Sequence, residues 1–315
     1  MHEVFVRYSR MAFFMINLQD LYKWCAVPVD ELERREGLKI RLRIVPDSKT
    51  MGELMAGEFV AEITAANGEG RELRAIVPCG PSAWYAPFVR MVNEKRVSLK
   101  NLHVFHMDEC LNWQGGLLAV NDPYNFKTQM LRHFYSGVDP LLAVPESHRH
   151  FLEPVNMEFI REEIWRAPVD ITLGGWGQDG HIAYNQARRH PYSPITLEQL
   201  RNASVRIQEN NYDTILALAH RTLGAAYQFV PPMSITLGVK ECLSAKKVRV
   251  FSDTGAWKQT ALRVALFSPP DAEYPLTLLQ EHGDAIITAT RETAAHPISE
   301  HPEWEFETGD GSLSR

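Results

Sequence analysis

Short apolar runs alternate with longer amphipathic runs along most of the chain. The short runs predict strands over residues 38–45, 72–78, 101–107, 169–175, 246–252 and 284–290. Apolar residues at three- and four-residue steps predict a helix that begins at Asp47 or Ser48, and further helices over 82–95, near 124–134 and over 255–266. This alternation predicts an α/β fold with an open, mainly parallel sheet covered by helices.

The alternation begins only after residue 38. Residues 1–38 end in the charged stretch "VDELERREGLK", which predicts an N-terminal extension ahead of a single α/β domain over residues 39–315. Ligands of open α/β sheets gather at the carboxyl ends of the strands. The loops that follow the predicted strands are therefore the candidates for a functional site.

Composition narrows the class of partner. A formal net charge of −6 argues against nucleic acid or an anionic membrane as the main partner. Small anions stay open, because a few local cations or a helix N-terminus can hold a phosphate. The four cysteines lie far apart without a CxxC pair, and the apolar stretch 11–18 is too short to span a bilayer. We therefore expect a cytoplasmic protein.

The loop after the strand at 72–78 reads "VPCGPSAW". Backbone N–H groups around Gly80 and the hydroxyl of Ser82 are candidates for holding a phosphate at the start of the next helix. Pro81 weakens this interpretation because it removes one N–H donor. The alternative is a tight turn in which Ser82 only caps the helix.

Two adjacent carboxylates, Asp108 and Glu109, follow the strand at 101–107. Side chains alternate along an extended chain, so only one of the two can face a given pocket. The alternative is an ordinary acidic loop with a helix cap. Nearby His103 and His106, and the histidines of "HRH" at 148–150, are interpreted as structural or surface residues, because no carboxylate or cysteine completes a metal set.

The loop after the strand at 169–175 reads "GGWGQDGHIAYNQ". Glycines such as Gly175 and Gly177 permit a close approach of the backbone to a ligand. Asp179 and His181 are two residues apart, and a histidine whose tautomer is fixed by a carboxylate is the usual general acid/base at neutral pH. The alternatives are a histidine satisfied within a polar core and an aspartate that caps the following turn.

Lys258 lies in "SDTGAWKQTA", within the first turns of the helix expected near Gly255. A cation near a helix N-terminus is unfavourable by the macrodipole, unless it faces a bound anion. The alternative is a solvated surface lysine.

Six blocks, in this order, resemble the glucosamine-6-phosphate deaminase/isomerase family, whose superfamily includes 6-phosphogluconolactonase. The blocks are "FHMDE", "GGWGQDGHIAYN", "VRIQENNYDT" (205–214), "VPPMSITLGV" (230–239), "GAWK" and "LLQEH" (278–282). The resemblance implies a Rossmann-like α/β fold with helices on both faces, no metal and no cofactor. It also implies aldose–ketose isomerisation with loss of ammonia from a small-molecule sugar phosphate, and it allows a homo-oligomer.

The resemblance also implies roles for individual residues. Asp108 would be the base that moves a proton between C2 and C1 of the sugar, with Glu109 beside it as a candidate substrate contact. His181 would open the pyranose ring, held by Asp179. Lys258 and the loop from Gly80 to Ser82 would bind the phosphate.

Three positions depart from the family pattern. The deaminases carry a glutamate at Gln186, a second loop glycine at Pro81 and a phosphate-binding arginine at His220, next to which this chain has Arg221. Gln186 can hydrogen-bond but cannot neutralise an imidazolium. The departures leave open a 6-phosphogluconolactonase-type hydrolase, a catalytically weakened paralogue that binds a sugar phosphate, and a sugar-phosphate sensor.

Overall fold

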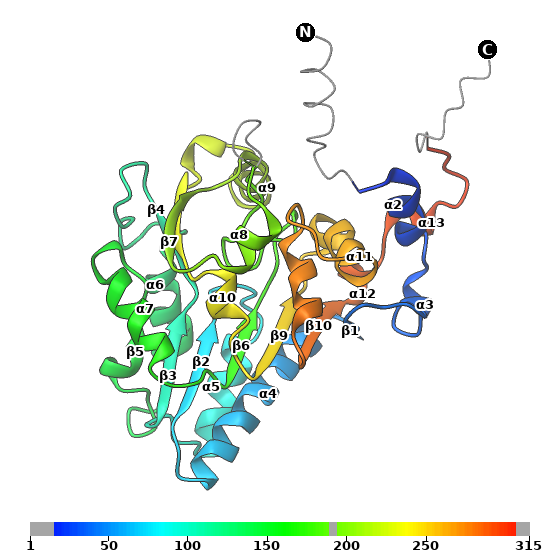
Figure 1. Cartoon of the computed structure of the whole chain (residues 1–315). Coiled ribbons are helices and arrows are strands. Elements are labelled where there is room, and N and C mark those ends of the chain that lie inside the picture. Colours follow the sequence, from blue (N-terminus) through cyan, green and yellow to red (C-terminus); the bar gives the residue numbers. More distant parts are fainter. Residues whose placement is uncertain (1–15, 189–193, 307–315) are drawn as a thin grey trace, which may run out of the picture.

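The computed structural model describes residues 16–188 and 194–306. A seven-stranded, fully parallel sheet forms its centre, in the order β1-β10-β9-β6-β2-β3-β5 (Figure 1). The strands are β1 (Arg41–Val45), β2 (Leu73–Val77), β3 (Leu102–His106), β5 (Arg149–His150), β6 (Ile171–Gly174), β9 (Lys247–Ser252) and β10 (Ala285–Thr290). The prediction of an open, parallel α/β sheet is confirmed.

Alternation along the central strands divides the core between two faces of the sheet. Along β2, Ala75 and Val77 join one apolar cluster, whereas Ile76 joins the other. The first cluster contains residues of α4 (Ser48–Gly68), α5 (Tyr85–Glu94), α6 (Phe126–Met130) and the π-helical turn η1 (Leu131–Tyr135). The second contains residues of α7 (Met157–Trp165), α10 (Val239–Cys242) and α11 (Gln259–Phe267). Helices therefore cover both faces, as expected.

The helix N-termini follow the sequence signals closely. Asp47 caps α4 by accepting a hydrogen bond from the Thr50 backbone N–H at 2.7 Å. Pro87 falls in the first turn of α5, where its missing N–H does no harm. The helix expected near 124–134 is α6 followed by η1, and that expected over 255–266 is a 3₁₀ turn, η5 (Gly255–Lys258), followed by α11.

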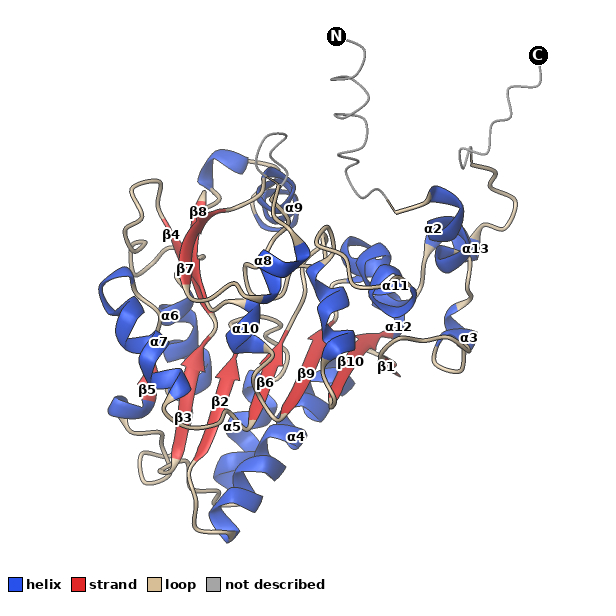
Figure 2. Ribbon diagram, in the orientation of Figure 1, coloured by secondary structure: helices blue, strands red, loops and turns tan. Residues whose placement is uncertain are grey.

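A second sheet was not predicted from the sequence. It contains β4 (Asp108–Leu111), β8 (Met233–Thr236) and β7 (Arg206–Glu209), which pair antiparallel in that order. In Figure 2 it rises from the end of β3. The remaining elements are α8 (Leu197–Arg201), α9 (Tyr212–Thr222), α12 (Arg291–Ala294), α13 (Pro297–Glu300) and the 3₁₀ turns η2 (Glu146–His148), η3 (Pro154–Asn156), η4 (Tyr227–Phe229) and η6 (Pro275–Glu281).

Residues 16–38 form α2 (Leu18–Cys25) and α3 (Val29–Leu32) and pack against the main body. Leu32 is fully buried in the second cluster, and Trp24 stacks on Phe267 of α11. Arg291 of α12 pairs with Asp30 at 2.6 Å. The division into an extension (1–38) and one domain (39–315) stays a prediction. Among the described residues, no helix is both long and apolar enough to cross a membrane.

A histidine cluster lies at the β5 edge of the sheet. His103 Nδ1 and His150 Nε2 are 3.2 Å apart, and the His148 ring stacks on His103 with centroids 3.8 Å apart. A carboxylate, Glu163, does lie within 4.8 Å of the ring nitrogens of His103 and His150, contrary to the sequence interpretation. However, Arg74 and Arg166 both bond to this carboxylate. The structural role expected for these histidines fits this pairing.

Candidate active site

The four candidate loops follow four adjacent strands, β9, β6, β2 and β3, at the carboxyl ends (Figure 2). The loops after β6 and β2 touch: a Cβ added to Gly175 would lie 3.3 Å from the Gly80 carbonyl oxygen. The end of β3 is also bound to β2, because the Met107 N–H donates to the Val77 carbonyl at 3.1 Å. Residues far apart in the sequence therefore border one region of the molecule.

His181 and Asp179 form a tight pair on the β6 loop. His181 Nδ1 lies 2.6 Å from Asp179 Oδ1, and the same oxygen accepts the His181 backbone N–H at 3.3 Å. Asp179 is buried and can only accept when ionised, so Nδ1 carries the proton. No described residue bonds to Nε2, which is the nitrogen left for a substrate atom.

The glycines of this loop make room for the pair. A Cβ on Gly177 would lie 2.0 Å from Cε1 of His181, so the imidazole packs directly on the Gly177 backbone. Gly180 has a φ of +73° and packs against Tyr274. Gly177 therefore helps to place His181. The pattern of glycines alone predicted only that the backbone could approach a ligand closely.

Gln186 is held by the start of α9 and lies beside His181. Its amide oxygen accepts the Asn211 backbone N–H at 2.9 Å, and its amide nitrogen donates to Thr214 Oγ1 at 2.5 Å. The same nitrogen lies 3.5 Å from His181 Nδ1, but both atoms are donors once Nδ1–H is bonded to Asp179. Asp179 is therefore the carboxylate that orients the imidazole, and Gln186 adds no charge.

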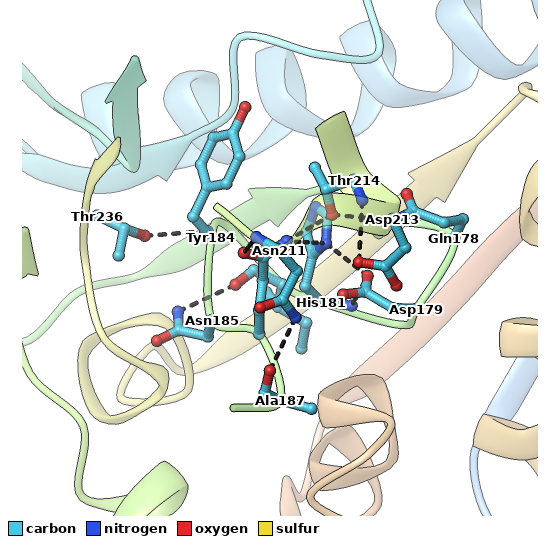
Figure 3. A network of polar contacts seen from close by, with 12 residues as sticks. Gln178, Asp179, His181, Tyr184, Asn185, Ala187, Asn211, Asp213, Thr214 and Thr236 are labelled. Carbon is cyan, nitrogen blue, oxygen red and sulfur yellow. Dashed lines mark hydrogen bonds and ion pairs between the residues drawn. The ribbon is translucent and has the colours of Figure 1, made fainter. Parts of the chain in front are cut away.

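Figure 3 shows this network around Thr214, whose hydroxyl also accepts an amide N–H from Gln178 at 2.9 Å. Gln178, Asn211 and Thr214 were missed by sequence reasoning. Two of them, Asn211 and Thr214, lie in the block "VRIQENNYDT", which resembles the family. The block alone does not show which side chains they bond to. Tyr184 extends the network, because its ring stacks on His181 with centroids 5.6 Å apart.

Asp108 and Glu109 point to different surroundings, as their adjacency in a strand requires. Glu109 accepts the backbone N–H groups of Cys110, Phe126 and Lys127 at 2.7–2.9 Å, and so caps α6. It is not placed to contact a ligand. Its pKa rises to about 7 because burial outweighs these hydrogen bonds.

Asp108, the other carboxylate of the pair, is half-buried. Burial, and secondarily the charge of Glu109, raise its pKa to about 8. A carboxyl group with a pKa near the operating pH can both take and return a proton. Asp108 is the first residue of β4, and its charge also acts on the Cys79 thiol, two residues after the end of β2, and on the Tyr184 hydroxyl.

Lys258 ends the 3₁₀ turn η5, rather than lying inside an α-helix. Burial, and secondarily the charge of Arg221 of α9, lower its pKa to about 8, whereas Asp253 and Asp179 act in the opposite direction. Among the described residues, no carboxylate lies within ion-pair distance of its ammonium group. The charge of Arg221, the residue after His220, acts on Lys258. His220 instead faces Trp257, with the two ring centroids 6.2 Å apart.

Ser82 borders a second space. Ser82 and Cys79 line an open groove of about 690 Å³ between α5 and η1, with Arg132 and His133 on its other wall. Gly80 and Ser82 are exposed and thus accessible to a ligand. The structure therefore brings Gly80 and Pro81 against Gly175, while Ser82 also faces the groove.

No protein-family profile matches the chain. It is 27% identical to a glucosamine-6-phosphate isomerase of Candida albicans over 267 residues, which covers 81% of this chain and 98% of that protein. It is 28% identical to a glucosamine-6-phosphate deaminase of Parabacteroides distasonis over 262 residues, covering 81% and 91%. These similarities confirm the resemblance predicted from the six blocks.

Solved structures give the same fold. A monomeric glucosamine-6-phosphate deaminase superposes with a TM-score of 0.67 at 19% identity, covering 80% of this chain and 98% of that one. A 6-phosphogluconolactonase of Shewanella baltica superposes with a TM-score of 0.54 at 15% identity, covering 79% and 97%. The Rossmann-like fold shared by the two groups is thus the fold of this chain.

Proposed function

We propose that this chain, a distant relative of the glucosamine-6-phosphate deaminase/isomerase family, converts glucosamine 6-phosphate and water into fructose 6-phosphate and ammonia. The proposal rests on one observation above all. A half-buried carboxyl group, a carboxylate-held histidine and a half-buried ammonium group lie at the ends of neighbouring strands. Among the described residues, no carboxylate lies within ion-pair distance of that ammonium group. Isomerisation of an amino sugar phosphate needs one group of each kind.

His181 acts first, on the pyranose ring. Its Nε2 lies free to exchange a proton with the ring oxygen and the anomeric hydroxyl, while Asp179 keeps Nδ1 protonated and stabilises the imidazolium. The ring then opens to the aldehyde. Gln186 holds its place beside the imidazole without contributing a negative charge, so Asp179 is the carboxylate that supports ring opening in this proposal.

Asp108 then moves the proton that defines the isomerisation. As the carboxylate, it removes the proton from C2 and returns it to C1, which converts the amino aldose into the imine of the ketose. Water adds to the imine carbon, and ammonia leaves. A pKa of about 8 suits both halves of this transfer near neutral pH.

Lys258 and the loops at Gly80–Ser82 and Gly175 bind the phosphate in this proposal. The ammonium group lies near Arg221 with no carboxylate in ion-pair distance among the described residues, so a dianion would relieve the repulsion between the two cations. The adjoining loop backbones at Gly80 and Gly175 lie close together at the same strand ends. The substrate would thus be fixed at its phosphate and react at C1 and C2.

One observation favours a second candidate. The uncharged Gln186 lies beside a histidine that bonds to the carboxylate of Asp179, and such a histidine–carboxylate pair can activate a water molecule for lactone hydrolysis. The solved 6-phosphogluconolactonases share the fold. A hydrolase of this type would not need the proton transfer assigned to Asp108.

The test is an assay of purified protein with glucosamine 6-phosphate, in which ammonia and fructose 6-phosphate are both measured. A parallel assay follows hydrolysis of 6-phosphogluconolactone. Asp108→Asn should abolish ammonia release, whereas the exposed-carboxylate control Asp20→Asn should not. Lactone hydrolysis that survives Asp108→Asn, without ammonia release by the wild-type protein, would favour the hydrolase instead.

A further inference from the structure

We propose that Trp176 is a positioning residue for phosphate recognition: its indole face supports the Lys258 ammonium group and leaves the N–H donors of that group free for the ligand. The inference rests on the proposed function only in naming the ligand as a phosphate. The contact between Trp176 and Lys258 stands on the structure itself.

Two contacts join the residues. Lys258 Nζ lies 5.8 Å from the centroid of the Trp176 ring, within the range of a cation–π interaction. The Trp176 indole N–H also points to the carbonyl oxygen of Lys258, at 3.4 Å. One side chain thus touches both the main chain and the charged end of the lysine.

The ring has little freedom to move away. Trp176 is 2% exposed and belongs to the apolar cluster that includes Ala261 and Leu262 of α11. It directly follows Gly175, whose backbone lies against the Gly80 carbonyl. The indole is therefore fixed between the β6 loop and the turn η5, and it fixes the turn in relation to the loop.

The electrostatics explain why an aromatic face is suited to this position. Burial and Arg221 of α9 disfavour the charged lysine, while Asp253 at the end of β9 and Asp179 on the β6 loop favour it without reaching ion-pair distance. A carboxylate partner would occupy the N–H donors and repel a phosphate. An indole face attracts the cation through its quadrupole and takes up no hydrogen-bond donor.

The test is competitive acetylation of Lys258 across pH, read by mass spectrometry of the peptide that contains it, with and without inorganic phosphate. The variants are Trp176→Leu, which removes the ring, and Trp176→Phe, which keeps a smaller ring. Trp84→Phe is the matched control, because Trp84 is equally buried but lies in the cluster on the opposite face of the sheet.

Loss of the ring removes a contribution that holds the ammonium charged. Trp176→Leu should lower the midpoint of the Lys258 reactivity curve by about one pH unit, and Trp176→Phe by less. Protection by phosphate should weaken about three- to tenfold in Trp176→Leu at pH 7.5, a range that follows from the same interaction energy. Trp84→Phe should leave the midpoint at its wild-type value.

The proposal is overturned if both Trp176 variants fold and give the wild-type midpoint and the wild-type protection. A purely structural role would lower thermal stability in Trp176 and Trp84 variants alike without moving the midpoint. If phosphate fails to protect Lys258 in the wild-type protein, the proposed phosphate site is wrong. The response of the midpoint to Trp176 still decides whether the indole supports the ammonium.

Discussion

The molecule gathers histidines and carboxylates in two places, and the two places differ in what the side chains bond to. In the β6 loop, one histidine bonds to one buried carboxylate through Nδ1 and keeps Nε2 for a ligand. At the β5 edge, His103 and His150 bond to each other, and Glu163 is taken by two arginines. The comparison teaches that residue type alone does not make a site, because the partners decide which atoms remain available.

Burial disfavours the charged form of the side chain in both regions, with different consequences for a histidine and for a carboxyl group. It lowers the pKa of His150 to about 4, so this ring is neutral at physiological pH and serves as a packing and hydrogen-bonding group. Burial instead raises the pKa of Asp108 to about 8, which places its proton exchange in the working range of an enzyme. The following predictions test this contrast between a reactive and a structural region.

The largest effect is expected for Asp108→Asn, which removes the proposed base. Ammonia release should fall by about 10³-fold or more, at the upper end of what a positioned base contributes. The neighbouring variant Glu109→Gln should act on stability instead, since an amide cannot accept all three backbone N–H groups; a loss of about 1–3 kcal/mol is expected. Steady-state rates and urea unfolding check the two outcomes. Equal loss of rate in both variants would erase the distinction.

The histidines give the next test. His181→Asn should reduce kcat by about 10²-fold or more with glucosamine 6-phosphate, because His181 is the group to which the proposal assigns ring opening. His148→Asn changes a ring that stacks on His103 and should leave kcat within about twofold while lowering the melting temperature. Kinetics and thermal unfolding of both variants are the measurements. A large loss of kcat in His148→Asn would show that the β5 edge is not only structural.

The pH profile should report the titration of the site. The base acts when deprotonated, so kcat/KM should fall about tenfold for each pH unit below the Asp108 pKa of about 8. Phosphate binding needs charged Lys258, so kcat/KM should also fall above its pKa of about 8. The profile is thus a narrow bell centred near pH 8. A flat profile between pH 6 and 8 would mean that Asp108 is not the group that limits the free enzyme.

Gln186→Glu should have the smallest effect. The new carboxylate would keep the oxygen bonded to the Asn211 N–H and place its other oxygen near Thr214 and His181. A second negative charge beside the imidazolium should raise the rate of ring opening by about two- to tenfold, the scale of one partly solvated charge interaction. Product formation from the cyclic sugar measures it. An unchanged or lower rate would mean that Asp179 already suffices.

Six of the seven strands of the parallel sheet and the loops that follow them could be predicted, because the apolar periodicity is strong and the loop residues are unusual. The short strand β5 and the order of the strands in the sheet were not predicted. Asp47 as a helix cap and Pro87 in a first turn follow from local rules. The second sheet could not be predicted, since β7 and β8 are short and pair over long sequence distances. The residues of a short strand do not specify which other strand it pairs with.

The site was predictable in its residue types and less so in its contacts. Asp108, Asp179, His181 and Lys258 were chosen as candidates from their chemistry at strand ends, and their roles stay predictions. Whether Asp108 or Glu109 faces the helix α6 depends on which backbone N–H groups lie nearby, and Phe126 and Lys127 come from a later segment. The support of Lys258 by Trp176 likewise depends on packing between loops that are 82 residues apart. Such contacts appear only once the chain is folded.

The central claim is that the strand-end region isomerises and deaminates an amino sugar phosphate. The most direct measurement is NMR of glucosamine 6-phosphate incubated with the purified protein in deuterated buffer at pH 8. The account predicts ammonia and fructose 6-phosphate in equal amounts. It also predicts deuterium at C1 of the ketose in those turnovers in which the proton held by Asp108 exchanges with solvent before it is returned, and loss of all three signals in Asp108→Asn. Phosphate-protected Lys258 together with unchanged, undeuterated glucosamine 6-phosphate would contradict it.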